Sequence, residues 1–482
     1  TRSLSVTLVE GDDGTSDGSG DDTSTGDDGS IGGSGSSGGN ESGGENVDDG
    51  VMVGTDMDEL LEVSMETETV RGLGGDDLIR TAEMADSYLD VSGGAGDDVL
   101  EAGGRSGFVA VEGDFGPADS IETIRPGDAA SGTLLTESRG TVVDLSETKL
   151  ENMTVDAQGG SDRVIGNDDA NTIKPGSGGD QIIAGGGDDT IEVDAGDRGF
   201  DDYRGGAGTD TVRAGDSGMP IGLRGDFTPE NSIEQITSDG HNNVVANGSF
   251  GDNILDFSET TLDGVTVNGR HGDDEITGNA DGNRLRGGGG DDSLSGGAGD
   301  DVFLVDRHDN GFDTFNGGDG DDTIKAMRSE TEIGLKGDFG PANSVERITA
   351  DGNGDVSIQG DDDANTLDFS ETQIDGANPM HAGRGNDRVV GSEQDNRIHG
   401  GDGADILTGG GGNNTFVYER FDSGNDTITD FDPSGDSITL EGFLRFQRTR
   451  DDEDDLVVEL SNGSNITLSG LAGTDPETLD IG

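Results

Sequence analysis

Apolar residues recur every nine positions over much of this chain. Between residues 158 and 192, acidic or amide residues stand nine apart, and each is followed two positions later by an apolar one: Val164, Ile173, Ile182 and Ile191. Nine is neither the 3.6-residue period of a helix nor the alternation of a long strand. We therefore predict a glycine-rich turn of about six residues and then a strand of about three, whose middle side chain points inward.

Two such beats would complete one coil of the backbone. Stacked coils would bury the apolar residues in an interior file, which a single repeat could not bury on its own. The pattern therefore predicts an all-β fold, a right-handed parallel β-roll or β-solenoid.

A long repeat overlies the short one. Gly-Asp-Phe recurs at Gly113, Gly225 and Gly337, and Asp-(Leu/Phe)-Ser-Glu-Thr recurs at Asp144, Asp256 and Asp368, both at the same constant interval. This interval indicates tandem units that arose by duplication. We divide the chain into an acidic Gly/Ser tether (1–50), a degenerate first unit with its spacer (51–161), a second unit with its spacer (162–273), a third unit with its spacer (274–386), a final repeat block (387–430) and a C-terminal β cap (431–482).

Composition changes this picture, because the chain is too polar for an ordinary core. It has 482 residues, of which 28% are hydrophobic, and 28 Lys and Arg against 104 Asp and Glu leave a net charge of −76. Such a composition is typical of disordered chains, and it predicts disorder for the tether at 1–50. For the rest, some interaction other than an apolar core must hold the fold. Cysteine is absent, which excludes disulfides and thiolate metal sites.

The charge also limits the partners. A polyanion would repel nucleic acid, and no stretch approaches the roughly 20 apolar residues of a transmembrane segment. Lysine occurs only four times, and excess carboxylate with scarce lysine resembles proteins of salt-loving organisms. The alternative is that the acid simply binds cations.

The turns carry a known motif. Residues 93–100 and 296–303 fit the nonapeptide GGxGxDxUx, as do 205–212 and 317–324. This pattern resembles the calcium-binding repeat of the RTX (repeats-in-toxin, hemolysin-type) proteins. Glycine permits the positive φ that turns carbonyl oxygens toward one point, aspartate adds a carboxylate, and calcium prefers six to eight oxygens.

The resemblance implies several calcium ions, each held between turns one coil apart, so that ligands pair at a separation of 18. Six such pairs are Asp162 with Asp180, Asn171 with Asp189, Asp274 with Asp292, Asn283 with Asp301, Asp387 with Asp405, and Asn396 with Asn414. Three further candidates need an expanded coil, because each follows the preceding aspartate at a wider separation: Asp98 after Asp77, Asp210 after Asp189, and Asp322 after Asp301. Six divalent ions supply about +12, so calcium cannot neutralise the chain.

The remaining segments favour strands. The spacers, such as residues 221–267, are interpreted as longer calcium-free coils or as a small inserted sandwich. Near the C-terminus, residues 455–460 and 465–468 predict a hairpin that caps the solenoid. The run 430–441 imitates an EF-hand loop, but its strand-like flanks favour coincidence.

The resemblance implies a secreted or cell-surface calcium-binding protein that folds when calcium binds and serves a structural or adhesive, non-catalytic role. Cell-surface glycans or proteins are the candidate partners besides calcium. The alternative is an RTX accessory part of an extracellular polysaccharide-acting enzyme or hydrolase, or a site borne on the solenoid itself. No catalytic domain of about 150 residues stands outside the repeats, which favours a protein without enzymatic activity.

Overall fold

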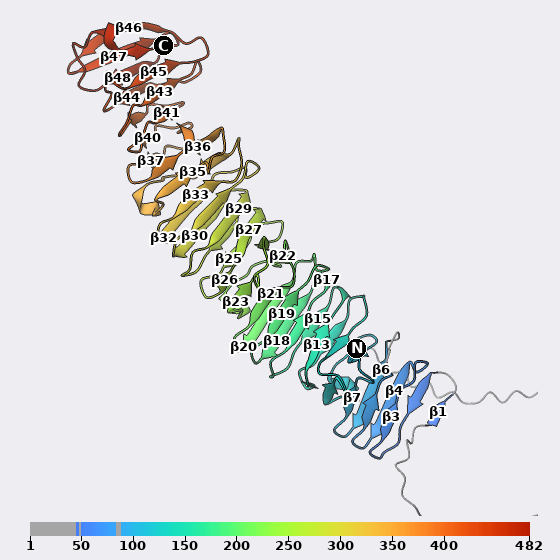
Figure 1. The fold of residues 1–482 in the computed structure, drawn as a ribbon. Helices are drawn as coiled ribbons and strands as arrows, with labels where there is room; N and C mark the ends of the chain where they lie inside the picture. The colour runs from blue at the N-terminus through green and yellow to red at the C-terminus, as the bar shows by residue number, and fades with distance from the viewer. Residues whose placement is uncertain (1–44, 48–49, 83–87) are drawn as a thin grey trace, which may run out of the picture. The chain divides into compact units, whose positions relative to one another are not determined.

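Short strands from successive coils stack in chain order and pair with the strand one coil earlier and one coil later (Figure 1). The computed structural model describes residues 45–47, 50–82 and 88–482. The predicted tether at 1–50 lies outside the described residues, apart from 45–47 and 50. Every strand pairing in this part is parallel except β1 with β2, β46 with β47, and β47 with β48. The predicted all-β parallel solenoid is therefore confirmed.

The first coils form two sheets. One contains β1 (Glu45–Val47), β2 (Val51–Val53), β4 (Thr69–Gly74) and β6 (Asp90–Ala95). The other contains β3 (Leu60–Glu62), β5 (Leu78–Arg80), β7 (Val99–Glu101), β9 (Thr123–Arg125) and β12 (Lys149–Leu150).

The next three sheets lie within residues 108–263. The longest contains β8 (Phe108–Ala110), β10 (Gly132–Leu135), β13 (Met153–Asp156), β16 (Thr172–Lys174), β19 (Thr190–Val193), β21 (Thr211–Ala214), β23 (Gln235–Thr237) and β26 (Thr261–Asp263). A second contains β11 (Val142–Asp144), β15 (Arg163–Ile165), β18 (Gln181–Gly186) and β20 (Asp202–Ala207), and a third pairs β14 (Gly159–Gly160) with β17 (Ser177–Gly178).

The following two sheets lie within residues 220–375. One contains β22 (Pro220–Gly222), β24 (Val244–Asn247), β27 (Val265–His271), β29 (Arg284–Gly289), β31 (Val302–Val305), β33 (Thr323–Ala326), β35 (Arg347–Thr349) and β38 (Gln373–Asp375). The other contains β25 (Ile254–Asp256), β28 (Glu275–Thr277), β30 (Ser293–Ala298) and β32 (Thr314–Asp319).

The last two sheets reach the C-terminus. One contains β34 (Glu332–Leu335), β36 (Val356–Gly360), β39 (Ala377–His381), β41 (Arg397–His399), β43 (Thr415–Tyr418), β45 (Ser437–Leu440) and β49 (Asp480–Ile481). The other contains β37 (Thr366–Asp368), β40 (Arg388–Val390), β42 (Ile406–Thr408), β44 (Asn425–Ile428), β46 (Phe446–Asp452), β47 (Asp455–Leu460) and β48 (Asn465–Leu468). Four short 3-10 helices complete the regular structure of the described residues: η1 (Pro117–Asp119), η2 (Pro229–Asn231), η3 (Pro341–Asn343) and η4 (Pro476–Thr478).

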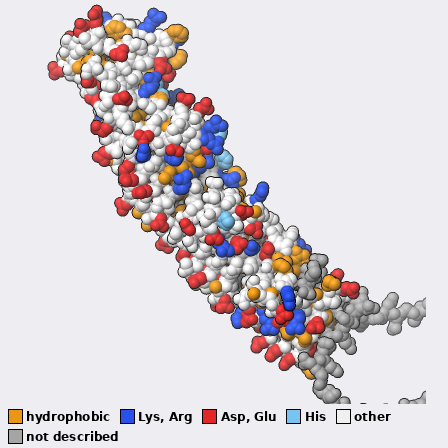
Figure 2. Space-filling model, viewed as in Figure 1, with side chains coloured by type: hydrophobic (Ala, Val, Ile, Leu, Met, Phe, Trp, Pro, Cys, Tyr) orange, Lys and Arg blue, Asp and Glu red, His pale blue; other side chains and the backbone are white. Residues whose placement is uncertain are grey.

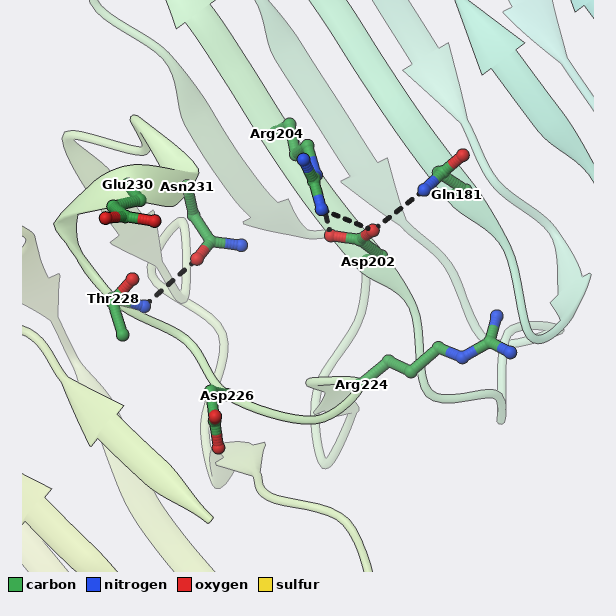
Figure 3. Close-up of a pocket in the computed structure, with 8 residues that line it drawn as sticks. All are labelled: Gln181, Asp202, Arg204, Arg224, Asp226, Thr228, Glu230 and Asn231. Atoms are coloured by element: carbon green, nitrogen blue, oxygen red, sulfur yellow. Dashed lines mark hydrogen bonds and ion pairs between the residues drawn. The ribbon is translucent and has the colours of Figure 1, made fainter.

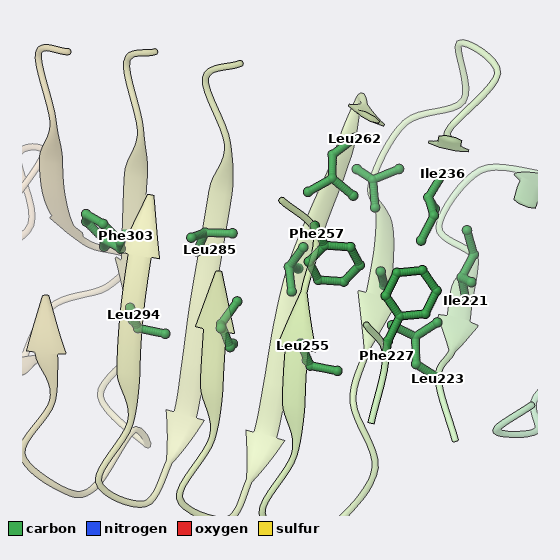
Figure 4. Close-up of a cluster of buried hydrophobic side chains, with 14 of the residues drawn as sticks. Ile221, Leu223, Phe227, Ile236, Leu255, Phe257, Leu262, Leu285, Leu294 and Phe303 are labelled. Carbon is green, nitrogen blue, oxygen red and sulfur yellow. The ribbon is translucent and has the colours of Figure 1, made fainter. Parts of the chain in front are cut away.

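The interior is the file of apolar side chains that the nine-residue beat predicts. Val164 pairs with Ile182 and Ile173 with Ile191, and these four residues are at most 1% exposed. Figure 4 shows this file continuing through the spacer after residue 220.

The spacers continue the solenoid. Spacer strands such as β10, β24 and β36 lie in the same sheets as the repeat strands, so the spacer is a set of larger coils and the inserted sandwich is wrong. Packing in the core accounts for the two motifs of the long repeat, because their aromatic residues contact each other there. Phe227 of Gly-Asp-Phe stacks on Phe257 of Asp-Phe-Ser-Glu-Thr at 5.0 Å, and both are buried (Figure 4).

The C-terminal hairpin forms over the residues predicted for it. β47 and β48 pair antiparallel, and β48 joins the parallel stack through β44. The sequence did not reveal β46, which pairs antiparallel with β47 and ends the sheet. The EF-hand-like run 430–441 follows strand β44 and contains strand β45, so strands and not helices accompany it, as predicted.

Candidate metal centre

The predicted ligands form ladders along the stacked turns. In each ladder, the backbone N–H of one residue donates to a side-chain oxygen of the equivalent residue one coil later. The N–H of Asp162 donates to Asp180 Oδ1 at 2.7 Å, and the N–H of Asn171 donates to Asp189 Oδ1 at 2.6 Å. These are two of the six pairs predicted at a separation of 18.

The other four pairs make the same contact. It joins Asp274 to Asp292, Asn283 to Asp301, Asp387 to Asp405, and Asn396 to Asn414, at 2.6–3.0 Å. The expanded coils preserve it as well, since the N–H groups of Asp77, Asp189 and Asp301 donate to Oδ1 of Asp98, Asp210 and Asp322 at 2.8–2.9 Å. The structure thus brings together all sixteen residues predicted from the sequence, in adjacent turns.

The second carboxylate oxygen of each ladder aspartate has no hydrogen-bond partner. These Oδ2 atoms are buried, and the aspartates that carry them are at most 3% exposed. They are the Oδ2 atoms of Asp77, Asp98, Asp162, Asp180, Asp189, Asp210, Asp274, Asp292, Asp301, Asp322, Asp387 and Asp405. A buried carboxylate oxygen without a donor is costly, so each of these atoms requires a proton or a cation.

Glycines keep open the space next to these oxygens. A Cβ on Gly205 would lie 2.3 Å from Asp210 Oδ2 and 2.0 Å from the carbonyl oxygen of Ser232, and a Cβ on Gly296 would lie 2.1 Å from Asp301 Oδ2 and 2.7 Å from the carbonyl oxygen of Gly317. A carboxylate oxygen and a carbonyl oxygen of the next coil therefore converge over each glycine. Only a residue without a side chain leaves room for both.

The ladder carboxyls repel one another and are poorly solvated. Burial raises the pKa of Asp180, Asp189, Asp274 and Asp387 from 3.8 to about 7, and the neighbouring carboxylates in the ladder add to this. Burial also raises the pKa of Asp77, Asp292, Asp301 and Asp405 to about 6. A hard divalent cation, which prefers oxygen ligands, fits these buried anionic groups.

The residues present therefore fit calcium. The ladder aspartates would hold it with backbone carbonyl oxygens of the glycine-rich turns, and the bound ion would supply positive charge between coils that otherwise repel one another. In the described part of the chain, no group of three or more His, Cys, Asp or Glu side chains is close enough to hold a metal alone. Backbone oxygens must complete the coordination, as the glycine pattern implies.

The four predicted asparagines differ from the aspartates. The amide nitrogens of Asn171 and Asn283 donate to Asn167 and Asn279 at 2.8 and 3.0 Å, and that of Asn396 donates to several backbone carbonyls. Asn414 accepts from Asn396 in the last ladder. These side chains already have partners, so they extend the ladders without adding a negative charge.

The sixteen predicted ligands do not include the residues that end the ladders. Asp201, Asp313 and Asp426 accept from the N–H of Asp180, Asp292 and Asp405, and Asp436 accepts from Asn414. The carboxylates of Glu122, Glu234 and Glu346 accept from the ladder residues Asp98, Asp210 and Asp322. The three glutamates stand one long repeat apart, and this spacing was the signal that could have found them.

An open pocket of about 630 Å³ lies outside the ladders, between β20 and the loop around η2 (Figure 3). Its lining is polar and charged. Asp202 accepts from Gln181 at 2.9 Å and pairs with Arg204 at 3.2 Å, whereas Glu230 and Asp226 lie across the pocket.

The surface carboxylates are distinct from the ladder carboxylates. Figure 2 shows Asp and Glu side chains spread over the visible face, with Lys and Arg side chains among them. Because the ladder aspartates are buried, calcium bound there would leave most of this surface charge to solvent and salt.

The fold and its ladders define a class: a parallel β-solenoid with acidic, glycine-rich turns stacked in register. The family description "RTX calcium-binding nonapeptide repeat" matches residues 90–104, 156–191, 165–198, 266–303, 309–327 and 381–416. The chain therefore carries RTX calcium-binding nonapeptide repeats over these residues.

Among solved structures, the chain is similar to the extracellular lipase LipA from Serratia marcescens. The identity is 20%, the TM-score is 0.22, and the match covers 48% of this chain and 44% of the lipase. The match thus spans less than half the length of that structure. No curated protein matches the chain. Of the described helices, none has the length and apolar character to cross a membrane.

Proposed function

We propose that the protein is a secreted or cell-surface repeat protein whose solenoid folds when several calcium ions bind between its coils, and that its role is structural or adhesive. The observation that carries this proposal is the set of twelve buried aspartate Oδ2 atoms without a partner. Outside the cell, calcium reaches concentrations at which sites with a Kd of about 10⁻⁴ to 10⁻³ M are filled. The ion would then supply the stability that the small apolar core does not.

Circular dichroism at one fixed ionic strength tests this proposal. We expect little β signal in chelator and a full signal in millimolar calcium, with magnesium at the same concentration as the control for a general effect of divalent charge. Equal β content in chelator and in calcium would overturn it.

One surface supports the adhesive role. Phe250 is 65% exposed, its ring meets Phe200 at 5.9 Å, and the guanidinium of Arg270 lies 4.0 Å above the Phe250 ring. Arg270 has a φ of 86°, a conformation that costs about 1–3 kcal/mol in a residue with a side chain, and the nonapeptide has glycine at this position. An exposed aromatic and cationic surface in so acidic a protein favours a carboxylated glycan as partner.

Binding to immobilised glucuronate-terminated oligosaccharide tests this surface. Arg270→Gly restores the repeat consensus and should keep the fold while lowering binding at least tenfold. The neutral glucose oligosaccharide is the control ligand. Equal retention of Arg270→Gly and the unaltered protein would contradict the assignment.

A second candidate is a solenoid-borne polysaccharide-acting enzyme, which the pocket in Figure 3 favours because Asp226 and Glu230 both line it. Incubating the calcium-loaded protein with uronic-acid polymers, followed by product analysis, tests this candidate. Turnover that Asp226→Asn or Glu230→Gln abolishes would establish it in place of the non-catalytic role.

A further inference from the structure

An acidic loop recurs at the same place in three units, before the last coil of the nonapeptide block. It carries two aspartates four positions apart: Asp197 and Asp201, Asp309 and Asp313, and Asp422 and Asp426. The second aspartate of each pair ends a ladder. The first aspartate belongs to no ladder and does not occupy the aspartate position of a nonapeptide.

In two of the units, a cationic or titratable side chain of the protein contacts that first aspartate. Arg286 Nη2 lies 2.5 Å from Asp309 Oδ1, and His399 Nε2 lies 2.8 Å from Asp422 Oδ2. The interval from Arg286 to His399 equals the interval from Asp309 to Asp422, so the same repeat position supplies the partner in both units.

The second unit has a lysine at this position but uses it differently. Lys174 stands one long repeat before Arg286, yet its Nζ lies 2.7 Å from Glu192 Oε1. Position 304 of the next unit, which corresponds to Glu192, is a leucine. The glutamate therefore holds the lysine, and Asp197 has no ion pair among the described residues.

Asp197 is therefore a buried carboxylate that no ion pair neutralises among the described residues. It is 2% exposed, its Oδ1 accepts from the N–H of Gly199 at 3.0 Å, and its Oδ2 has no partner. The charges that act most strongly on Asp197 are those of Asp201 and Asp180, and both are acidic. Burial, followed by the charge of Asp201, raises the pKa of Asp197 to about 8.

The other groups around the pair do not supply the missing charge. Asp201 accepts from the N–H of Asp180 at 2.8 Å and from the hydroxyl of Tyr203 at 2.9 Å. Arg224 attracts Asp180 and Asp201 at longer range, but its guanidinium donates to the carbonyl of Gly179 and lines the pocket of Figure 3. A second pocket of about 520 Å³ lies beside the pair and is lined by Asp197 together with Arg198 and Arg270, although neither arginine forms an ion pair with Asp197 among the described residues.

We propose that Asp197 and Asp201, beside Asp180 one coil earlier, bind a divalent cation, calcium, where the other two units place Arg286 and His399. The site stands outside the nonapeptide consensus and occurs in the second unit alone among the three. The aspartates supply the charge, and backbone carbonyls and water complete the oxygen shell that calcium requires. The site shares Asp180 and Asp201 with a ladder and in that respect rests on the proposed function, whereas Asp197 itself belongs to no ladder.

Counting bound ions tests the proposal. The full-length chain is dialysed against calcium and the ions per chain are measured by atomic emission. We expect Asp197→Asn to lose one ion per chain and the matched variant Asp309→Asn, whose aspartate pairs with Arg286, to lose none. An equal count for Asp197→Asn and the unaltered protein overturns the proposal. Loss of ladder sites would instead lower the count in all three proteins equally.

Two further variants test whether Lys174 pairs with Asp197 in solution instead of with Glu192. If Lys174 neutralised Asp197 in solution, Lys174→Met would gain one ion, a result that overturns the proposal; we expect no change. Arg286→Met should gain one ion in the third unit, because it leaves Asp309 without its cationic partner.

A luminescence measurement covers the case in which Asp197→Asn perturbs folding. The chain has three tyrosines and no tryptophan, and Tyr203 contacts Asp201. Terbium bound at the pair should therefore be sensitised through Tyr203. We expect tyrosine-excited terbium emission to fall in Tyr203→Phe and to persist in Tyr88→Phe, whereas equal emission from both variants counts against the site.

Discussion

The backbone N–H of Asp162 donates to Oδ1 of Asp180 at 2.7 Å, across one full coil of the chain. This contact uses one carboxylate oxygen to fix the register between coils and leaves the other, Oδ2, buried without a partner. The same side chain is therefore both a structural acceptor and a candidate calcium ligand. Removing its charge should affect calcium binding more than it affects the register.

Asp180→Asn tests that separation. The amide keeps an oxygen that can accept from Asp162 but loses the negative charge, so we expect the chain to bind at least one calcium ion fewer and to require several-fold more calcium for folding. Calcium titration followed by circular dichroism measures both effects. Asp128→Asn, an exposed site with the same change of charge, is the control; a midpoint shift as large as that of Asp180→Asn would show that net charge alone matters.

Glycine next to the ladder carboxylate should be irreplaceable. A Cβ on Gly287 would lie 2.1 Å from Asp292 Oδ2, although the backbone there does not need positive φ. We expect Gly287→Ala to cost about 1–3 kcal/mol of unfolding free energy through steric overlap and to weaken calcium binding. Gly354→Ala, where a Cβ meets nothing within 4 Å, should be near neutral in the same chemical denaturation experiment. If both variants unfold alike, the space over Gly287 has no special role.

The extent to which the ladders could be predicted depends on coil length. Asp162, Asp180 and Asp189 follow a fixed nine-residue beat, so the sequence alone places them in adjacent coils. Asp201 comes 21 positions after Asp180 and Glu234 comes 24 after Asp210, because a loop or a 3-10 helix lengthens those coils. The nine-residue repeat therefore does not predict that Asp201 and Glu234 belong to the ladders.

The sequence also does not show which carboxylate a long cationic side chain contacts. Lys174 and Arg286 occupy one repeat position, yet one contacts Glu192 and the other Asp309. Lys174 could pair with Glu192 or with Asp197, and only the arrangement of the neighbouring strands decides between them, whereas Arg286 has Leu304 in place of the glutamate. The spacer core was easier, because Leu223, Leu255 and Phe257 show their burial through the repeated motifs.

The metal-free protein should be more stable in mild acid than at neutral pH. Burial raises the pKa of Asp180, Asp189 and Asp274 from 3.8 to about 7, so the folded state binds more protons than the unfolded state between about pH 4 and pH 7. The stability that these aspartates contribute is fully present below their pKa in the unfolded state, and it is lost as the pH rises through their folded-state pKa of about 7. Circular dichroism in chelator should therefore show more β structure at about pH 5 than at about pH 7.5.

Saturating calcium should reverse that order, because protons compete with the ion for the same carboxylates. The calcium-loaded protein is expected to be more stable at about pH 7.5 than at about pH 5, measured by thermal melts. If chelated and calcium-loaded proteins respond to pH in the same direction, the ladder carboxylates do not bind the ion.

The spacer core should contribute stability without contributing ions. Phe257 is fully buried and stacks on Phe227 at 5.0 Å, so Phe257→Ala should cost about 3–5 kcal/mol. We expect chemical denaturation in saturating calcium to show this loss with an unchanged ion count. Phe250→Ala, at an exposed ring, should leave stability nearly unchanged. An ion lost from Phe257→Ala would mean that the spacer and ladders are not separable.

Salt should stabilise the protein even when calcium is saturating, because the surface carboxylates remain unpaired. The net charge is −76, and six divalent ions would supply only about +12. Raising the ionic strength from about 0.1 to 1 M shortens the Debye length from about 10 to about 3 Å, so repulsion between exposed carboxylates should fall and the melting temperature should rise by several degrees. Tetramethylammonium chloride is the control for specific sodium binding, since it screens charge without being a good carboxylate ligand. A melting temperature that does not depend on salt would mean that hydration alone offsets the surface charge. That result would contradict the interpretation of the acidic composition as an adaptation to salt.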